Sequence, residues 1–343
     1  MKQNQTKMLL QLFAEPTVNV TTAAASGNDL SAEMQTFYDM TLIDEAGPEL
    51  VHDQFGQKRP IPAGGGKTIQ FRRFSPLPKA TTPLTEGVTP AGNKLNVSKV
   101  EATVSQYGDY LVQSDVLELT AIDNTIAESV KLLGKQAGIT LDTVVRNVLQ
   151  SGTNVWYAPA ISAGGMVTEL SDRSSINRDC PLTVDLVKKV AAWMRANNVP
   201  KINGSYVAII HPNVAFDLMK DEKWEDYHKY AAPENLYEGE LGRIAGVRFV
   251  ESTEAKIYGG EGAGGDSVYG CLFFGDGAYG TTEVTGGGLQ TIVKQKGSAG
   301  TGDPLDQRSS VGWKALKTAE ILVEPYLIRV ECGSSFGPKA ASN

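Results

Sequence analysis

The sequence predicts an α+β fold, and three observations support that prediction. Two segments with alternating apolar and polar residues form a long ribbon at 67–113, one amphipathic helix covers 125–150, and the chain from residue 183 mixes helix and strand patterns. The chain has 343 residues, about twice the usual domain length of roughly 150, so one large core or two moderate cores are expected. With 41% hydrophobic and 21% charged residues, the composition is that of a globular protein.

The chain is rich in glycine and proline and poor in histidine and cysteine. It contains 36 Gly and 16 Pro but only 3 His and 3 Cys. This predicts many loops and leaves little material for metal sites or thiol chemistry. The net charge of −7 argues against a broad basic surface for nucleic acid. A loop-rich, acidic chain of this kind favours a scaffold over an enzyme.

The sequence predicts neither secretion nor a membrane span. Cys180, Cys271 and Cys332 lie far apart and are odd in number, which indicates three thiols in a reducing compartment. The apolar run Met8–Ala14 is too short for a signal peptide and is stopped by Glu15. No stretch approaches the roughly 20 apolar residues that span a bilayer. The chain is therefore expected to be cytoplasmic when made and to bind no membrane.

Residues 1–62 are interpreted as an extended arm. The stretch from Asn4 to Gly27 is polar, and a short helix pattern at 30–51 is interrupted by Pro48. Three glycines at 64–66 then mark a linker. Such an arm needs another surface to hold it.

Residues 63–113 predict a long two-stranded ribbon. Thr68–Phe74 and Leu95–Val112 have the two-residue period of half-buried strands, and the segment between them carries four prolines from Pro76 to Pro90. An isolated two-stranded ribbon is only marginally stable in water. A ribbon of this length is therefore expected to dock on a neighbouring molecule.

The clearest helix follows the ribbon. Thr125-x-x-Glu128 fits a capping box, and apolar residues then recur at steps of three and four as far as Gly152. The pattern lasts about 25 residues, or roughly 38 Å, against an average globular helix of about 11 residues. This helix is expected to act as a long strut.

The chain from residue 183 predicts a mixed α/β region. Its expected elements are helices at 184–195 and 214–220 and strands at 206–210, 244–250, 268–274, 290–294 and 319–331. Glycine-rich 259–265 is expected to be a surface loop, 297–307 a flexible stretch, and the tail 333–343 disordered.

Three glycine motifs match nucleotide-binding patterns in part. Gly64–Thr68 ends like a phosphate-binding loop, but Ile61 occupies its first glycine position and a strand pattern follows. Gly260–Gly265 and Gly275–Gly280 both have the dinucleotide spacing. Residues 281–285 after the second motif read as a strand, so no helix N-terminus is available for a pyrophosphate. All three motifs are interpreted as turns.

No catalytic constellation emerges from the remaining side chains. His52, His211 and His228 each stand alone, and no nucleophile with its own signature accompanies them. The acidic run at 217–226 does not fit the spacing of a calcium loop and is interpreted as a solvated helix face. We therefore expect no catalytic residue, no cofactor and no metal site.

Several stretches of the sequence together resemble one known family. The densest are Thr68–Leu77 with Leu84–Pro90 in the ribbon, Phe37–Leu42 and His52–Gly56 in the arm, and Asp115–Thr120 before the long helix. They are similar to segments of the major capsid proteins of tailed bacteriophages with the Hong Kong 97-like fold, and most of all to the coliphage N-four type.

The resemblance implies an α+β, Hong Kong 97-like capsid fold and names for its parts. It implies an N-terminal arm at 1–62, an extended β-hairpin E-loop at 63–113, a peripheral domain with a long spine helix at 114–182, an α/β axial domain at 183–305, and peripheral-domain return strands with a C-terminal tail at 306–343. The loops of the axial domain would meet at the symmetry axes of the capsomers.

The implied function is that of a major capsid protein of a tailed double-stranded DNA phage or prophage. Its copies would assemble into hexamers and pentamers, with portal and scaffolding or decoration proteins as partners and with packaged DNA bound without sequence specificity. An encapsulin-like compartment shell and a nucleotide-dependent enzyme using Gly275–Gly280 are the alternatives. Two arginines on opposite faces of a strand suggest intersubunit ion pairs. The E-loop candidates for intersubunit contact are Arg72, Arg73, Pro76, Lys79, Thr85 and Glu86.

Overall fold

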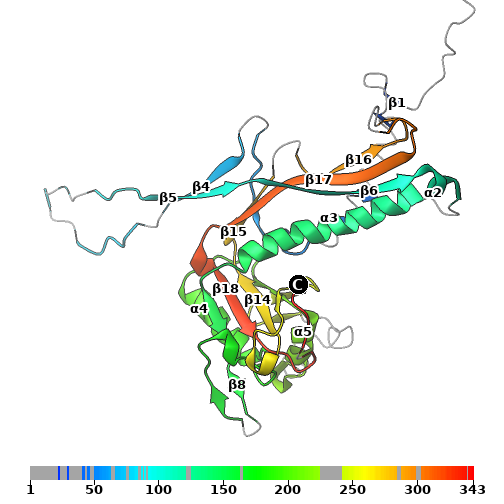
Figure 1. Cartoon of the computed structure of the whole chain (residues 1–343). Helices are drawn as coiled ribbons and strands as arrows, with labels where there is room; N and C mark the ends of the chain where they lie inside the picture. Colours follow the sequence, from blue (N-terminus) through cyan, green and yellow to red (C-terminus); the bar gives the residue numbers. More distant parts are fainter. Residues whose placement is uncertain are drawn as a thin grey trace, which may run out of the picture.

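The computed structural model has two connected units and a projecting ribbon (Figure 1). An elongated helix–sheet layer contains the longest helix, and a rounder α/β body lies at one end of that helix. The residues that the structure describes are 22–23, 29–30, 41–42, 45–46, 50–62, 66–74, 77–83, 86–87, 89, 92–120, 125–162, 165–224, 242–283, 287–298, 303–337 and 339–343.

The helix–sheet layer is organised around one long central strand, β17 (Arg308–Ile321). On one side β17 pairs antiparallel with β6 (Ser105–Ser114), and on the other side with β16 (Gln290–Lys294) and β15 (Tyr279–Glu283). Strand β3 (Gln57–Lys58) of the arm is parallel to β15, which completes five strands in the described residues. The arm therefore contributes to this sheet directly.

The α/β body is built on a second sheet, with seven strands in the described part of the chain. Its central strands are runs of buried apolar residues, as expected for a sheet that is covered on both faces. The strands, in spatial order, are β11 (Arg243–Ile244), β12 (Val247–Glu251), β10 (Tyr206–Ile210), β14 (Val268–Phe274), β18 (Leu327–Cys332) and β7 (Val155–Tyr157), with β13 (Ile257–Tyr258) paired to β14.

Two capped helices belong to the α/β body. Helix α4 (Val184–Ala196) begins after Thr183, whose hydroxyl accepts a hydrogen bond from the Leu186 N–H. Helix α5 (Pro212–Met219) begins after His211, whose Nδ1 accepts from the Asn213 N–H. The short elements elsewhere are α2 (Asp115–Thr120), the hairpin β8 (Ala160–Ile161) and β9 (Val167–Thr168), the pair β1 (Thr22–Ala23) and β2 (Asp29–Leu30), and the 3-10 turns η2 (Arg173–Ser175), η3 (Ala263–Gly265) and η5 (Glu324–Tyr326).

Helix α3 (Thr125–Leu149) confirms the predicted strut and joins the two units. Its first half packs on β17, and its second half packs against β14 and β15. Gly134 lies on the buried face, where a Cβ would be 2.9 Å from the carbonyl oxygen of Leu42, so the arm crosses the helix at this glycine. The helix starts at Thr125, whose hydroxyl donates to Gln113 at 3.1 Å rather than serving as the predicted N-cap.

The predicted ribbon is present. Strand β4 (Thr68–Phe74) pairs antiparallel with β5 (Val97–Thr103), and Figure 1 shows both projecting away from the two units. Phe71 anchors the ribbon at its root: this side chain is buried, and its ring lies 2.8 Å from where a Cβ on Gly280 of β15 would be. The glycine thus makes room for the anchoring ring.

The predicted strand at 319–331 is divided between the two units. Strand β17 ends at Ile321, and η5 with Pro325 separates it from β18, which pairs with β14 and β7 in the α/β body. Proline cannot donate to a strand ladder, so the chain turns there. Residues 306–343 consequently contribute to both units.

The tail 333–343 is not disordered as the sequence suggested, because its described residues are hydrogen-bonded along the α/β body. The Ser335 N–H donates to Asp217 at 2.8 Å, and the Ala340 N–H donates to the Ser267 hydroxyl at 2.8 Å. Asn343 accepts a hydrogen bond from the backbone of residue 257 at 2.8 Å. Small polar residues, which resemble a disordered segment in sequence, here supply the donors and acceptors that fix the tail.

Candidate assembly surfaces

The ribbon presents the described contact candidates to solvent. The side chains of Arg72, Lys79 and Glu86 are exposed, and in the described part of the chain no hydrogen bond or ion pair joins them to one another. Arg73 lies in β4, but its side chain is outside the described residues, as are Pro76 and Thr85. The three candidates whose side chains are described are therefore accessible, and they form no local cluster with one another.

One face of the ribbon holds two like charges opposite each other. Arg72 of β4 is directly opposite Lys99 of β5, and both side chains are exposed. Directly opposite residues of antiparallel strands share a face, so these two cations repel each other. On the same face the carboxylate of Glu101 accepts a hydrogen bond from Gln70 at 2.6 Å. Two cations and one carboxylate therefore share this exposed face.

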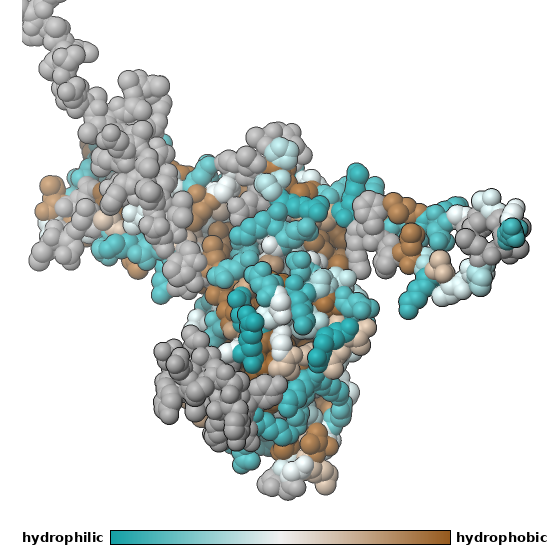
Figure 2. Space-filling view, turned by 180° about the vertical axis from the view of Figure 1, so that it is seen from behind, coloured by the Kyte–Doolittle hydropathy of each residue, from teal (hydrophilic) through white to brown (hydrophobic). Residues whose placement is uncertain are grey.

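Exposed apolar side chains gather at a few places outside the cores. They occur at the ribbon, at the end of the helix–sheet layer near α2, and on the β8–β9 hairpin, where Figure 2 shows brown hydrophobic atoms on the surface. Contiguous exposed apolar patches mark interaction sites more often than isolated residues do. The exposed residues at these three places are Leu77, Leu95 and Val97 of the ribbon, Tyr110, Leu111, Val112, Val116, Leu117 and Leu119 near α2, and Met166 and Val167 of the hairpin.

Buried polar contacts fix the arm where the two units meet. His52 and Asp142 of α3 are both fully buried, and the His52 Nδ1 lies 2.6 Å from the Asp142 Oδ2. The backbone N–H of His52 donates to the other carboxylate oxygen at 2.6 Å, and the Tyr279 hydroxyl donates to the His52 carbonyl oxygen. Asp53 is 2.9 Å from the buried Nζ of Lys317 in β17. The sequence did not predict this cluster, because His52 and Asp142 are 90 residues apart and no local motif links them.

The Asp53 pair predicts acid sensitivity. Burial alone would raise the pKa of Asp53, but the charges and hydrogen bonds of Lys317 and Lys58 outweigh it and hold this pKa below its ordinary value. A depressed carboxyl pKa stabilises the fold fully above the unfolded-state value of about 3.9 and loses that stabilisation as the pH falls through the folded-state pKa. Lys317→Met is therefore expected to move the acid-unfolding midpoint to higher pH, measured by circular dichroism.

The double variant Asp53→Asn with Lys317→Met is the matched control for this experiment. Because no buried carboxylate is left unpaired, its acid midpoint should lie below that of Lys317→Met. An unchanged midpoint in Lys317→Met would contradict the assignment.

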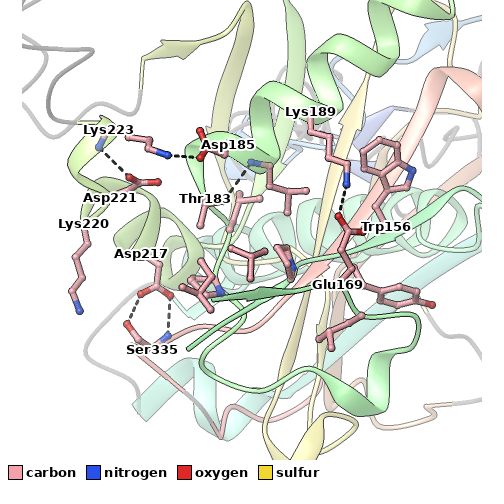
Figure 3. Close-up of a pocket in the computed structure, with 18 of the residues that line it drawn as sticks. Trp156, Glu169, Thr183, Asp185, Lys189, Asp217, Lys220, Asp221, Lys223 and Ser335 are labelled. Carbon is pink, nitrogen blue, oxygen red and sulfur yellow. Dashed lines mark hydrogen bonds and ion pairs between the residues drawn. The ribbon is translucent and has the colours of Figure 1, made fainter. Parts of the chain in front are cut away.

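A cavity of about 860 Å³ opens between the β8–β9 hairpin and the helices α4 and α5 (Figure 3). Four of its charged side chains form two ion pairs: Lys189 lies 2.8 Å from Glu169, and Lys223 is paired with Asp185. Asp221 accepts from the backbone N–H of residue 184 at 3.0 Å, so a carboxylate already occupies the start of α4.

The acidic run differs from the solvated face that the sequence suggested. Asp217 is buried and accepts from the Ser335 N–H, and Asp221 serves α4 as described. Glu225 and Asp226 lie outside the described residues. Of the three described carboxylates, those of Asp217 and Asp221 hold backbone N–H groups, which is a structural role. Glu222 is exposed, as the sequence suggested.

The glycines of Gly275–Gly280 serve packing and a turn. Strand β14 ends before Gly275, a two-residue turn follows, and β15 begins at Tyr279, so a strand and not a helix follows the motif. A Cβ at Gly275 would lie 2.3 Å from the Pro200 carbonyl oxygen, and Gly277 has a positive φ of 69°. Close packing thus requires glycine at position 275, and the backbone conformation favours glycine at position 277. The motif is therefore not followed by the helix N-terminus that binds a pyrophosphate in dinucleotide-binding folds.

The described residues contain neither a candidate metal centre nor a candidate transmembrane helix. Within them, no group of three or more His, Cys, Asp or Glu side chains is placed to hold an ion. None of their helices combines the length and apolarity needed to cross a bilayer.

Three solved capsid structures share this architecture. The capsid of the cyanophage P-SCSP1u has a TM-score of 0.63 and 15% identity, covering 83% of this chain and 89% of that one. The capsid of Ralstonia phage GP4 has a TM-score of 0.62 and 14% identity, covering 85% and 90%. The mature capsid of bacteriophage PhiM1 has a TM-score of 0.57 and 17% identity, covering 82% and 86%. The fold is therefore the Hong Kong 97-like capsid fold.

The phage capsid protein family matches residues 51–277, more than half of the chain, and the chain belongs to that family. No curated protein matches the sequence significantly. The family confirms the prediction of a non-enzymatic major capsid protein, and it disfavours both the encapsulin-like shell and the nucleotide-dependent enzyme.

Proposed function

We propose that this capsid protein forms the head of a tailed double-stranded DNA phage or prophage, through hexamers and pentamers of an icosahedral shell. The ribbon is the observation that carries the proposal. It projects beyond the packed units and exposes Leu77 by 55% and Leu95 by 64%. Apolar side chains on a two-stranded ribbon gain free energy only when another surface covers them. A neighbouring copy in a capsomer supplies such a surface.

The six ribbon candidates belong to this proposal as contacts between copies. Arg72 and Lys99 repel each other in the free chain, so carboxylates of a neighbour would stabilise both. Lys79 and Glu86 are exposed and available for the same contact. Arg73, Pro76 and Thr85 complete the set as positions along the same ribbon.

The other partners follow from the same function. Portal and scaffolding or decoration proteins would join the shell, which would be assembled in the cytoplasm of the bacterial host. Packaged DNA would be enclosed without sequence-specific binding, in keeping with the net charge of −7. The proposed subgroup is the coliphage N-four type, on the sequence resemblance of the ribbon and arm.

Electron microscopy of the purified full-length chain tests the function. Negative stain should show closed particles of uniform diameter, or capsomers that convert to particles when a scaffolding protein is co-expressed. A monodisperse monomer under both conditions, at micromolar concentration, would contradict a shell-forming role.

A further inference from the structure

Strand β13 has an inner edge within the sheet of the α/β body and an outer edge. On the inner side it pairs antiparallel with β14, and the Gly270 N–H donates to the Lys256 carbonyl oxygen at 2.9 Å. On the outer side no strand lies beside it among the described residues. In an antiparallel ladder the backbone groups of alternate residues point to opposite edges. The carbonyl group of residue 255 and the N–H groups of residues 257 and 259 therefore point outward.

Side chains of the tail 333–343 bond to these outward groups. The Asn343 carboxamide oxygen accepts from the Ile257 N–H at 2.8 Å, and its nitrogen donates to the Ala255 carbonyl oxygen at 3.0 Å. The Ser342 hydroxyl accepts from the Gly259 N–H at 2.8 Å. A carboxamide carries the same kinds of donor and acceptor as a peptide group. The two side chains thus take the hydrogen bonds that the backbone of an added strand would take.

Glycine at position 259 lets the tail approach this closely. A Cβ on Gly259 would lie 2.6 Å from the Ser342 backbone nitrogen and 2.8 Å from the Ala340 carbonyl oxygen. Both contacts are with backbone atoms, so any larger residue would displace the tail. The Ala340 N–H also donates to the Ser267 hydroxyl at 2.8 Å, which aligns the tail with the edge.

Hydrogen bonds, and not apolar burial, hold the tail at the edge. Residues 341–343 are exposed, and none of them belongs to a hydrophobic core cluster. Exposed hydrogen-bonded segments with few buried apolar contacts open locally at low free energy. Residues 341–343 can therefore leave the edge while the sheet stays folded.

We propose that residues 340–343 cap the outer edge of β13 and so prevent it from pairing with the same edge of a second copy. An uncovered edge strand is a template for pairing with another chain, and native proteins cover such edges. The partner is a second copy because two identical edges can pair antiparallel about a two-fold axis, each donating and accepting equally. The cap does not depend on the proposed shell, since its contacts all lie within one chain.

The cap has a consequence for assembly if the shell is as proposed. A two-fold pair is isologous and closes on itself, whereas a ring of five or six copies needs heterologous contacts. Copies paired through β13 would be diverted from such rings.

Gly259→Ala in the full-length chain tests the cap. The added Cβ displaces the tail and keeps the backbone groups of β13, and Gly259 has no positive φ that alanine would strain. In dilute unassembled subunits, the amide of residue 257 should exchange with deuterium about 10-fold faster than in the wild type, or more. The amide of Gly270 should exchange at the wild-type rate, because it lies in the β13–β14 ladder.

Three further variants define the effect. Deleting residues 340–343 should expose the amide of residue 257 in the same way, without a substitution in the sheet. Ser342→Ala removes only the bond to residue 259 and should leave the amide of residue 257 protected. Gly92→Ala, where a Cβ meets no atom within 4 Å, is the control for a glycine substitution and should match the wild type.

Sedimentation velocity then identifies what the uncovered edge binds. Gly259→Ala and the deletion should form dimers at concentrations where the wild-type subunit forms none, and the amide of residue 257 should regain protection in those dimers. Dimers with this amide unprotected would overturn the inference, as would variants that remain monomeric or that exchange this amide at the wild-type rate. None of these results bears on shell formation, which microscopy of the wild type tests separately.

Discussion

Replacing the ribbon tip, residues 76–92, with a short Gly-Ser turn is expected to give a folded subunit that makes no shells. The paired strands end at Phe74 and Val97, so the deletion leaves β4, β5 and the Phe71 anchor intact. None of the described residues of the tip belongs to a hydrophobic core cluster. The melting temperature should therefore stay close to that of the wild type.

Assembly should respond far more strongly than stability does. A contact worth about 3 kcal/mol at each interface changes the association constant by about 100-fold, and every subunit of a shell repeats that contact. Electron microscopy and sedimentation should show particles in the wild type and only monomers or capsomers in the variant. A Gly-Ser segment of the original length is the control for ribbon length. Normal-sized particles from the deletion would remove the ribbon tip from the assembly contact.

Asp142→Ala is expected to cause the largest loss of stability among single substitutions at the arm. Leaving a buried hydrogen-bonding group without its partner typically costs about 1–3 kcal/mol for each group. Here Asp142 also accepts the His52 backbone N–H, so two buried donors lose their partner. Urea unfolding of the unassembled subunit should show the loss as a lower midpoint.

Two matched variants define the origin of that loss. Asp142→Asn retains an acceptor for the backbone N–H and should be less destabilising than Asp142→Ala. Glu128→Ala breaks the exposed 3.0 Å pair with Lys131 on the same helix and should leave the midpoint unchanged. Equal midpoints for Asp142→Ala and the wild type would show that the buried pair does not hold the arm.

The elements that sequence predicts best are those whose pattern is set by their own burial. Strands 206–210 and 268–274 have the predicted bounds, because continuous apolar runs between turn residues leave few alternatives. Helix α3 also agrees, since its apolar steps continue over seven turns. In these places local pattern and tertiary packing favour the same structure.

The features that the sequence did not predict depend on residues whose partners are distant in the sequence. The tail 333–343 is ordered by side chains at 217 and 267, and a single-sequence pattern carries no information about those contacts. Asp217 appeared solvated because its partner, Ser335, lies 118 residues away. The His52–Asp142 pair spans 90 residues and likewise leaves no local signal. The ribbon candidates came from the family resemblance and from the strand pattern of the ribbon, and their role remains a prediction.

Only Val104 separates β5 from β6, and this continuity has a mechanical consequence. A pull on the ribbon travels along one covalent strand into the ten residue pairs that join β6 to β17. Because the pull is parallel to those strands, it shears the ladder, and many hydrogen bonds must break together instead of opening one after another. Outward pressure on a closed shell would thus be carried by tension in this strand, from one subunit to the next.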